Sequence, residues 1–191
     1  MTLNIELFWA INNLGQQYAF LNPSVVITAE YTIYLLALSM LVYWFTRTAA
    51  NRMMVIQAGL AFVFAELTGK VLGLLHAHQQ PFAELKDVNR LIEHGINNSF
   101  PSDHTILFFS VCMSYWLVRR KWGWLWLALA CCVAISRIWV GVHYPVDIAV
   151  GSLVGITGAL VSYWLVPKLP FIAVFLKRYE QAEQRIWPTT G

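Results

Sequence analysis

The feature that most constrains this chain is a succession of apolar runs, each about as long as a lipid bilayer is thick. A helix needs about 20 mostly apolar residues to cross the hydrocarbon core. The runs that approach or exceed this length are Pro23–Phe45, Met53–Leu75, Ser102–Val118, Trp122–Val140 and Pro145–Val166. With 58% hydrophobic and 12% charged residues, a soluble chain of 191 residues has no core large enough to bury them. We therefore predict an all-α fold, a polytopic membrane helical bundle with five clear spans.

The segments outside the five runs are also expected to be organised by the membrane. In residues 1–22, Leu7 and Ile11 recur at helical spacing opposite Asn12 and Gln16, which predicts an interfacial helix or a sixth span. Residues 77–101 form a polar loop, and residues 168–191 contain a charged, amphipathic stretch that predicts a tail helix. No repeat or linker divides the chain, so residues 1–191 are predicted to form a single integral membrane domain.

The basic residues indicate how the bundle is oriented. They follow the first, third and fifth spans, as Arg47, Arg52, Arg119, Arg120, Lys121, Lys168, Lys177, Arg178 and Arg185. Lys and Arg accumulate in the cytoplasmic connections of membrane proteins. The 77–101 loop and the turn between the fourth and fifth spans are therefore predicted to face the outer side of the membrane, and the 168–191 tail to be cytoplasmic.

Two short segments stand out on that outer side, "PSDH" (Pro101–His104) and "SRIWVGVHYPVD" (Ser136–Asp147). Ionisable residues at membrane depth are costly and are usually functional. Ser102 suits the N-cap of the third span, which leaves the first backbone amides of that helix free to bind an anion. The start of this span is therefore a candidate anion site.

The second segment supplies the remaining chemistry. Pro145 suits the first turn of the fifth span, and Asp147 then falls close to His143. A carboxylate beside an imidazole fixes its tautomer and supports the cation that forms when it reacts. Arg137 adds a planar guanidinium suited to phosphate oxygens. Together with His104, these residues predict a phosphoryl-transfer site that needs no metal.

The two segments resemble the second and third signatures, PSGH and SRxxxxxHxxxD, of the type 2 phosphatidic acid phosphatase superfamily. The residues of this chain resemble bacterial undecaprenyl-diphosphate phosphatases of the bacitracin-resistance (BcrC) type more closely still. This resemblance includes "ITAEYTIY" in the first span and "QPF" in the loop. The resemblance implies a phosphatidic acid phosphatase type 2-like bundle in the bacterial cytoplasmic membrane. It also implies hydrolysis of undecaprenyl diphosphate to undecaprenyl phosphate, which recycles the cell-wall lipid carrier and competes with bacitracin for its lipid target.

The resemblance further implies a role for each matching residue. His143 would attack the terminal phosphorus and form a phosphohistidine, while Asp147 would orient and polarise it. His104 would protonate the leaving lipid phosphate and then activate the hydrolytic water. The phosphate oxygens would be held by Ser102, Arg137 and the backbone amide of Asp103, which stands where the superfamily has Gly.

The first superfamily signature, KxxxxxxRP, lacks both of its basic residues here. The corresponding positions are Gly73 and Gln80, and Gln80 brings hydrogen-bond donors but no charge. Lys70 lies one helical turn before Gly73 and is a second candidate for phosphate contact. Because Glu66 precedes Lys70 by four residues, an intramembrane ion pair is at least as good an interpretation. Further candidates in the loop are Lys86 and Arg90.

Two other functions stay open from the sequence. A broader lipid phosphatase, acting on phosphatidylglycerol phosphate or phosphatidate, would share the fold and the signatures. A non-catalytic lipid-binding membrane protein would tolerate loss of the reactive histidines, which are present here.

The expected partners are the bilayer and a polyprenyl diphosphate lipid, with no nucleic acid, cofactor or metal. "HAH" (His76–His78) is interpreted as interfacial loop rather than metal site, and the oligomeric state leaves no trace.

Overall fold

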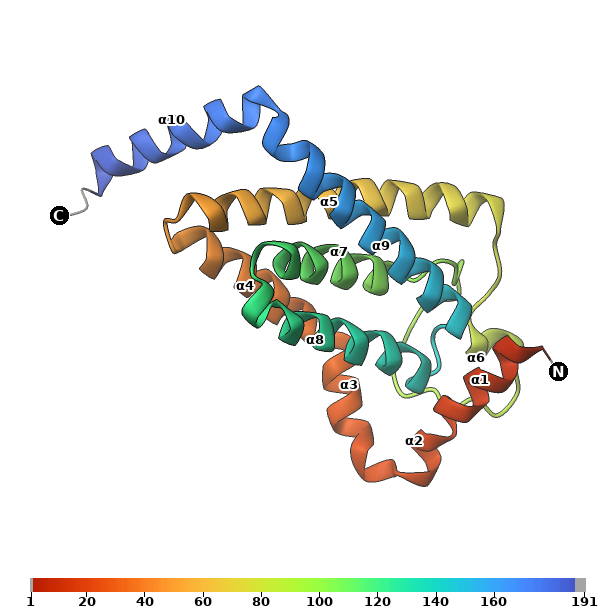
Figure 1. The fold of residues 1–191 in the computed structure, drawn as a ribbon. Helices are drawn as coiled ribbons and strands as arrows, with labels where there is room; N and C mark the ends of the chain where they lie inside the picture. Colours follow the sequence, from red (N-terminus) through yellow and green to blue (C-terminus); the bar gives the residue numbers. More distant parts are fainter. Residues whose placement is uncertain (1, 188–191) are drawn as a thin grey trace.

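The chain folds as a helical bundle built around one central helix. This computed structural model describes residues 2–187, which contain no β-strand. The helices of the bundle are α3 (Asn22–Glu30), α4 (Thr32–Phe45), α5 (Ala49–Leu75), α7 (Asp103–Val118), α8 (Arg120–Trp139) and α9 (Pro145–Leu165). Figure 1 shows α7 among α5, α8 and α9, with which it makes its main contacts. The predicted all-α fold is confirmed.

Shorter elements flank the bundle. They are α1 (Leu3–Asn12), α2 (Leu14–Gln17), η1 (Ala19–Leu21), α6 (Pro81–Glu84), η2 (Val166–Lys168) and α10 (Pro170–Ile186). The ten residues of α1 extend only about 15 Å, too short to cross a bilayer, and α1 packs against α8 and α9. This geometry fits the interfacial helix better than a sixth span. The predicted tail helix corresponds to α10, and residues 188–191 lie outside the described residues.

Helix length supports some of the predicted spans more strongly than others. Within residues 2–187, three helices are long and apolar enough to cross a membrane, namely α5, α8, and α9 with its extension through η2. The segment Ala19–Glu30, which joins η1 to α3, passes the same test together with α4, but the two are bent by 44° at their junction. Helix α7 is apolar but has only 16 residues. The chain is therefore a helical membrane protein, but the predicted count of five spans is not confirmed by length alone.

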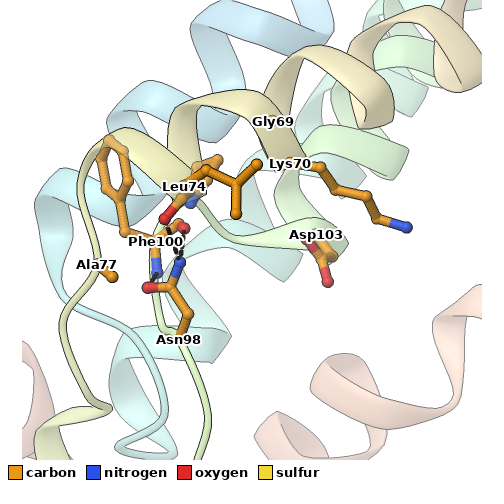
Figure 2. Close-up of a pocket in the computed structure, with 9 residues that line it drawn as sticks. Gly69, Lys70, Leu74, Ala77, Asn98, Phe100 and Asp103 are labelled. Carbon is orange, nitrogen blue, oxygen red and sulfur yellow. Dashed lines mark hydrogen bonds between the residues drawn. The ribbon is translucent and has the colours of Figure 1, made fainter.

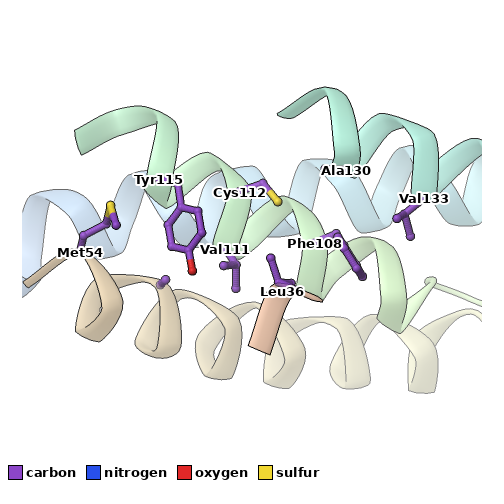
Figure 3. Close-up of a cluster of buried hydrophobic side chains, with 9 residues drawn as sticks. Leu36, Met54, Phe108, Val111, Cys112, Tyr115, Ala130 and Val133 are labelled. Carbon is purple, nitrogen blue, oxygen red and sulfur yellow. The ribbon is translucent and has the colours of Figure 1, made fainter. Parts of the chain in front are cut away.

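A cluster of buried side chains joins α7 to its neighbours (Figure 3). Its members are Leu36 of α4, Met54 and Ala58 of α5, Phe108, Val111, Cys112 and Tyr115 of α7, and Ala130 and Val133 of α8. The Tyr115 hydroxyl lies 3.0 Å from Ser39 Oγ, so its polar atom is satisfied inside the bundle. Lipid tails are as apolar as these side chains, so close packing, rather than exclusion of water, holds the helices together.

Glycines let α9 approach α7 more closely than any side chain would allow. A Cβ atom at Gly151 would lie 3.0 Å from the Ser102 carbonyl oxygen, and one at Gly155 would lie 2.8 Å from that of Ile106. Gly158 makes the same kind of approach to α5. This spacing of small residues is typical of helix contacts in membranes. It brings the first turns of α7 and α9 together.

We expect Gly155→Ala to lower the free energy of unfolding by about 1–3 kcal/mol, because the added methyl group overpacks the α7–α9 contact. Gly59→Ala is the matched control, since a Cβ atom there meets nothing within 4 Å and alanine favours a helix. Denaturant unfolding of both variants in detergent, followed by circular dichroism, measures the difference. Equal stabilities would contradict the proposed importance of this contact.

Candidate active site

The two sequence segments with polar residues meet where α7 and α9 begin. The backbone amide of Ser102 donates to the carbonyl oxygen of Asp147 at 3.3 Å, which ties the two segments directly. As predicted, Ser102 is the N-cap of α7, and its Oγ accepts from the amide of Thr105 at 3.4 Å. The first amides of a helix have no acceptor within it. Those of Asp103 and His104 therefore supply donors at the edge of the site.

His143 is presented by a tight turn between α8 and α9. Gly141 adopts a left-handed backbone with φ of 85°, which ends α8 and reverses the chain. The buried His143 ring then places Nδ1 3.0 Å from the carbonyl oxygen of Ser99. Donation of Nδ1–H to this carbonyl leaves Nε2 unprotonated. The imidazole thus has the tautomer that a nucleophile requires.

Asp147 is fully buried in the first turn of α9 and is held by several groups. Its Oδ2 atom accepts from the amide of Tyr144 at 2.8 Å and from the Ser99 hydroxyl at 2.7 Å. The same Oδ2 lies 3.6 Å from His143 Nδ1. Ser99 Oγ lies 3.2 Å from His143 Nδ1 and so bridges the acid and the imidazole. The predicted pairing is therefore close, but it is reinforced by a serine that the motifs do not include.

Burial of the His143 imidazole lowers its pKa, because desolvation disfavours the charged form. The hydrogen-bonding contact with Asp147 acts in the opposite direction but is the smaller effect. His143 therefore stays neutral to lower pH than an exposed histidine does. A neutral ring is the form that attacks phosphorus.

Arg137 lies in the last turn of α8 and is only 1% exposed. Its Nη1 donates to the carbonyl oxygen of Ala29 at 3.1 Å. Its Nε and Nη2 atoms are buried and have no hydrogen-bond partner within residues 2–187. Buried guanidinium donors without partners are costly and call for an acceptor. An anionic ligand such as phosphate would satisfy them.

His104 completes the group of residues predicted from the sequence. It is half-buried in the first turn of α7, within electrostatic range of Arg137 and His143. His94 of the loop also approaches this group, with its ring centroid 6.4 Å from that of His143. No cluster of His, Cys, Asp or Glu suited to a metal ion is found in the described part of the chain.

Gln80 and Lys70, which the sequence offers as phosphate contacts, are engaged elsewhere. Gln80 is fully buried, and its amide pairs with the side chain and the backbone amide of Asn97. Lys70 Nζ lies 3.6 Å from Glu66 Oε1, so the alternative of an i,i+4 ion pair is confirmed. Both side chains thus have protein partners in this structure.

Lys70 and Asp103 line an open groove of about 660 Å³ between α5 and the start of α7. Figure 2 shows both side chains, with Asn98 and Phe100 on the neighbouring loop. The residues that line this groove include neither His104 nor His143. Asp103 therefore lines this groove, while its backbone amide lies in the first turn of α7.

Ser99 and His78 are contacts of Asp147 that sequence reasoning missed. Ser99 belongs to the "NSFPSDH" stretch, so its position beside the motif was the available signal. His78 was interpreted as interfacial loop, yet its Nε2 lies 2.9 Å from Asp147 Oδ1. No local pattern joins two residues so far apart in the chain.

Comparison with known proteins places these features in context. The family model described as the PAP2 superfamily matches residues 54–171. The bacitracin transport permease protein BcrC of Bacillus licheniformis is 58% identical over 98% of this chain and 92% of its own length. The undecaprenyl-diphosphatase BcrC of Bacillus subtilis is 33% identical over 93% of this chain and 92% of its own.

A solved structure has the same arrangement of helices. The crystal structure of Aquifex aeolicus LpxE matches with a TM-score of 0.68 and 26% identity. The match covers 85% of this chain and 96% of that one. The similarity therefore extends across almost the whole bundle.

We expect the His143 imidazole to titrate below its ordinary pKa of about 6.5, since burial disfavours its cation. NMR of protein carrying isotope-labelled histidine, in detergent, measures this midpoint. The His143 signal is assigned by its loss in His143→Gln. A midpoint at or above the ordinary value would contradict the buried environment described for this ring.

Proposed function

Because this chain belongs to the PAP2 superfamily, we propose that it is a membrane-embedded phosphatase that hydrolyses undecaprenyl diphosphate to undecaprenyl phosphate and phosphate. The name of its Bacillus subtilis relative, undecaprenyl-diphosphatase, supports this substrate. The observation that carries the proposal is the buried Arg137, whose two free donors lie in a group with His104 and His143. Residues 1–191 act as one phosphatase domain, and the product is the lipid carrier for cell-wall synthesis.

In the first step, Nε2 of His143 attacks the terminal phosphorus of the diphosphate. The bond from this phosphorus to the bridging oxygen breaks, and undecaprenyl phosphate leaves. The Nδ1–H of His143 stays bonded to the Ser99 carbonyl oxygen. Asp147 stabilises the positive charge that the imidazole acquires as it becomes a phosphohistidine.

His104 serves both halves of the reaction as acid and then base. It first donates a proton to the oxygen of the departing undecaprenyl phosphate. In the second step it accepts a proton from the water that attacks the phosphohistidine. The phosphorus–nitrogen bond then breaks, phosphate is released and His143 is restored.

Arg137 and the start of α7 hold the phosphate oxygens. The free Nε and Nη2 donors of Arg137 suit two oxygens of one phosphoryl group. The first amides of α7 at Asp103 and His104 add donors at the positive end of the helix dipole, and Ser102 shapes this turn as its cap. Gln80 and Lys70 are left out of this set, because each already has a protein partner.

Transport is the other function suggested by a relative, since the Bacillus licheniformis protein is named as a permease. Simple passage of a lipid does not require a neutral, buried imidazole beside a carboxylate and an unpartnered arginine. Those features suit the transfer of a phosphoryl group. They favour an enzyme over a carrier.

The site faces the outer side of the bacterial cytoplasmic membrane. Figure 1 shows the α4–α5 and α7–α8 turns at one end of the bundle, and the α8–α9 turn at the other. The basic residues of the first group of turns include Arg47, Arg52 and Arg119. Positive residues tend to remain in the cytoplasm, which supports an outer position for the opposite end, with His143.

We expect His143→Ala to lower phosphate release from undecaprenyl diphosphate by roughly a thousandfold or more, because the nucleophile is lost. Phosphate is measured with purified protein in detergent, alongside phosphatidylglycerol phosphate and phosphatidate as competing substrates. Gly59→Ala is the control and should keep the parent rate. A folded His143→Ala protein with the parent rate would refute the mechanism.

The substrates compared in that assay also separate the alternative functions. Faster turnover of the glycerophospholipids than of the prenyl diphosphate would identify a broader lipid phosphatase. Binding of undecaprenyl diphosphate by the parent protein, without release of phosphate from any lipid, would identify a non-catalytic lipid-binding protein.

The orientation is tested with single cysteines at Gly95 and Gln184, after Cys112, Cys131 and Cys132 are replaced by alanine. Gly95 belongs to the loop near His143, and Gln184 is exposed on α10. We expect a membrane-impermeant maleimide to label only the Gly95→Cys protein in intact cells, and both proteins after lysis. Labelling of Gln184→Cys alone in intact cells would reverse the orientation.

A further inference from the structure

We propose that His78 is a positioning residue of the phosphatase reaction, which holds Oδ1 of Asp147 and so orients the carboxylate that supports His143. The inference rests on the proposed function, because it assigns a role within the same site. His78 falls within the span of the first signature, between Gly73 and Gln80, at a position that the signature leaves unspecified.

The backbone of His78 is fixed from both sides by the segment that leads into α7. Its amide donates to Asn98 Oδ1 at 3.2 Å, and its carbonyl oxygen accepts from the amide of Ser99 at 2.8 Å. The segment after α5 is thereby pinned to the residue that bridges His143 and Asp147. The direction of the His78 ring is set by the same contacts that build the site.

The His78 ring reaches the one oxygen of Asp147 that nothing else holds. Oδ2 already accepts from Ser99 and from the amide of Tyr144. Oδ1 lies 2.9 Å from His78 Nε2, and neither atom has a well-aligned hydrogen bond with any group in residues 2–187. A small rotation of the ring would turn this close contact into a hydrogen bond. The ring packs against Tyr144 and Phe100, with centroids 5.4 and 5.9 Å away.

A donor at Oδ1 matters because Asp147 is fully buried. A buried carboxylate oxygen without a partner costs more than an ordinary hydrogen bond gains. With His78 on one oxygen and Ser99 on the other, the carboxylate cannot turn away from His143. Its charge is then in place when the imidazole becomes positive, so less rearrangement is needed in the transition state.

The sequence "HAH" contains its own control. His76 lies two residues before His78 and is exposed. Its ring packs against the rings of Phe100 and His78, with centroids 5.0 and 5.5 Å away. No polar contact of the His76 side chain with Asp147 is found within the described residues. A substitution at His76 therefore removes a neighbouring histidine but keeps the contact between His78 and the Asp147 carboxylate.

The test compares His78→Ala, His78→Asn, His78→Gln and His76→Ala in the full-length protein in detergent. We expect His78→Ala and His78→Asn to lower kcat roughly tenfold to a hundredfold, as for the loss of a hydrogen bond to a charged group. KM for undecaprenyl diphosphate should stay unchanged, because His78 touches no substrate. The amide nitrogen of Gln reaches about as far as Nε2, so His78→Gln should recover most of kcat. His76→Ala should match the parent.

A second measurement does not depend on turnover. The His143 titration midpoint, measured by NMR, should rise in His78→Ala. Without a donor from His78, the Asp147 carboxylate stabilises the His143 cation more strongly. The midpoint should stay near the parent value in His78→Gln. The other titratable or charged groups that act on His143, namely Asp147, Arg137, His94 and His104, are not substituted in either variant.

The outcomes separate the two proposals. Parent kcat in a folded His78→Ala protein would overturn the role of His78. So would a His78→Gln protein no more active than His78→Asn, because the ring would then act by packing alone. A parent protein that releases no phosphate, but whose His143 midpoint rises in His78→Ala and not in His78→Gln, would overturn the phosphatase and keep His78 as a positioning residue.

Discussion

The close contact between α7 and α9 is the interaction on which the rest of the structure depends. Gly151 and Gly155 of α9 have no side chains, so the helix lies against the backbone of α7 at Ser102 and Ile106. Because the two helices begin side by side, the Ser102 amide can bond to the Asp147 carbonyl oxygen. Packing inside the bundle thereby sets the relative position of the two polar segments at its end. The reactive residues of the site are therefore positioned by a contact between glycines and backbone atoms that take no part in the reaction.

The site concentrates charge that a membrane protein ordinarily avoids. Asp147 and Arg137 are almost fully buried, and such groups persist only where they have partners or a ligand. Asp147 Oδ2 accepts from the Tyr144 amide and the Ser99 hydroxyl, and the His78 ring lies 2.9 Å from Oδ1. Arg137 keeps two donors free. The acid is thus held by the protein, whereas the arginine is left for a phosphate.

Side-chain amides help to order the loop that precedes α7. Gln80 pairs with Asn97, while the buried Asn12 of α1 donates to the Trp139 carbonyl oxygen at 2.9 Å and accepts from the Asn89 amide at 2.9 Å. These contacts hold the loop against α1 and the end of α8. Gln80, which stands at the position of the arginine in the first signature, thus contributes to the shape of the loop that carries His78, His94 and Ser99.

The sequence by itself determined the features that depend on neighbouring residues. Long apolar runs predicted helices in a membrane, Ser102 predicted the N-cap of α7, and the spacing of His143 and Asp147 predicted their proximity around the start of α9. It did not predict the partners of Gln80, or the contacts of Ser99 and His78 with Asp147. Local backbone geometry fixes a cap or a first-turn pair, whereas contacts between distant segments exist only after the helices have packed. Only the tertiary structure, through the approach of α9 to α7, decided which of the histidines in the loop would reach the buried acid.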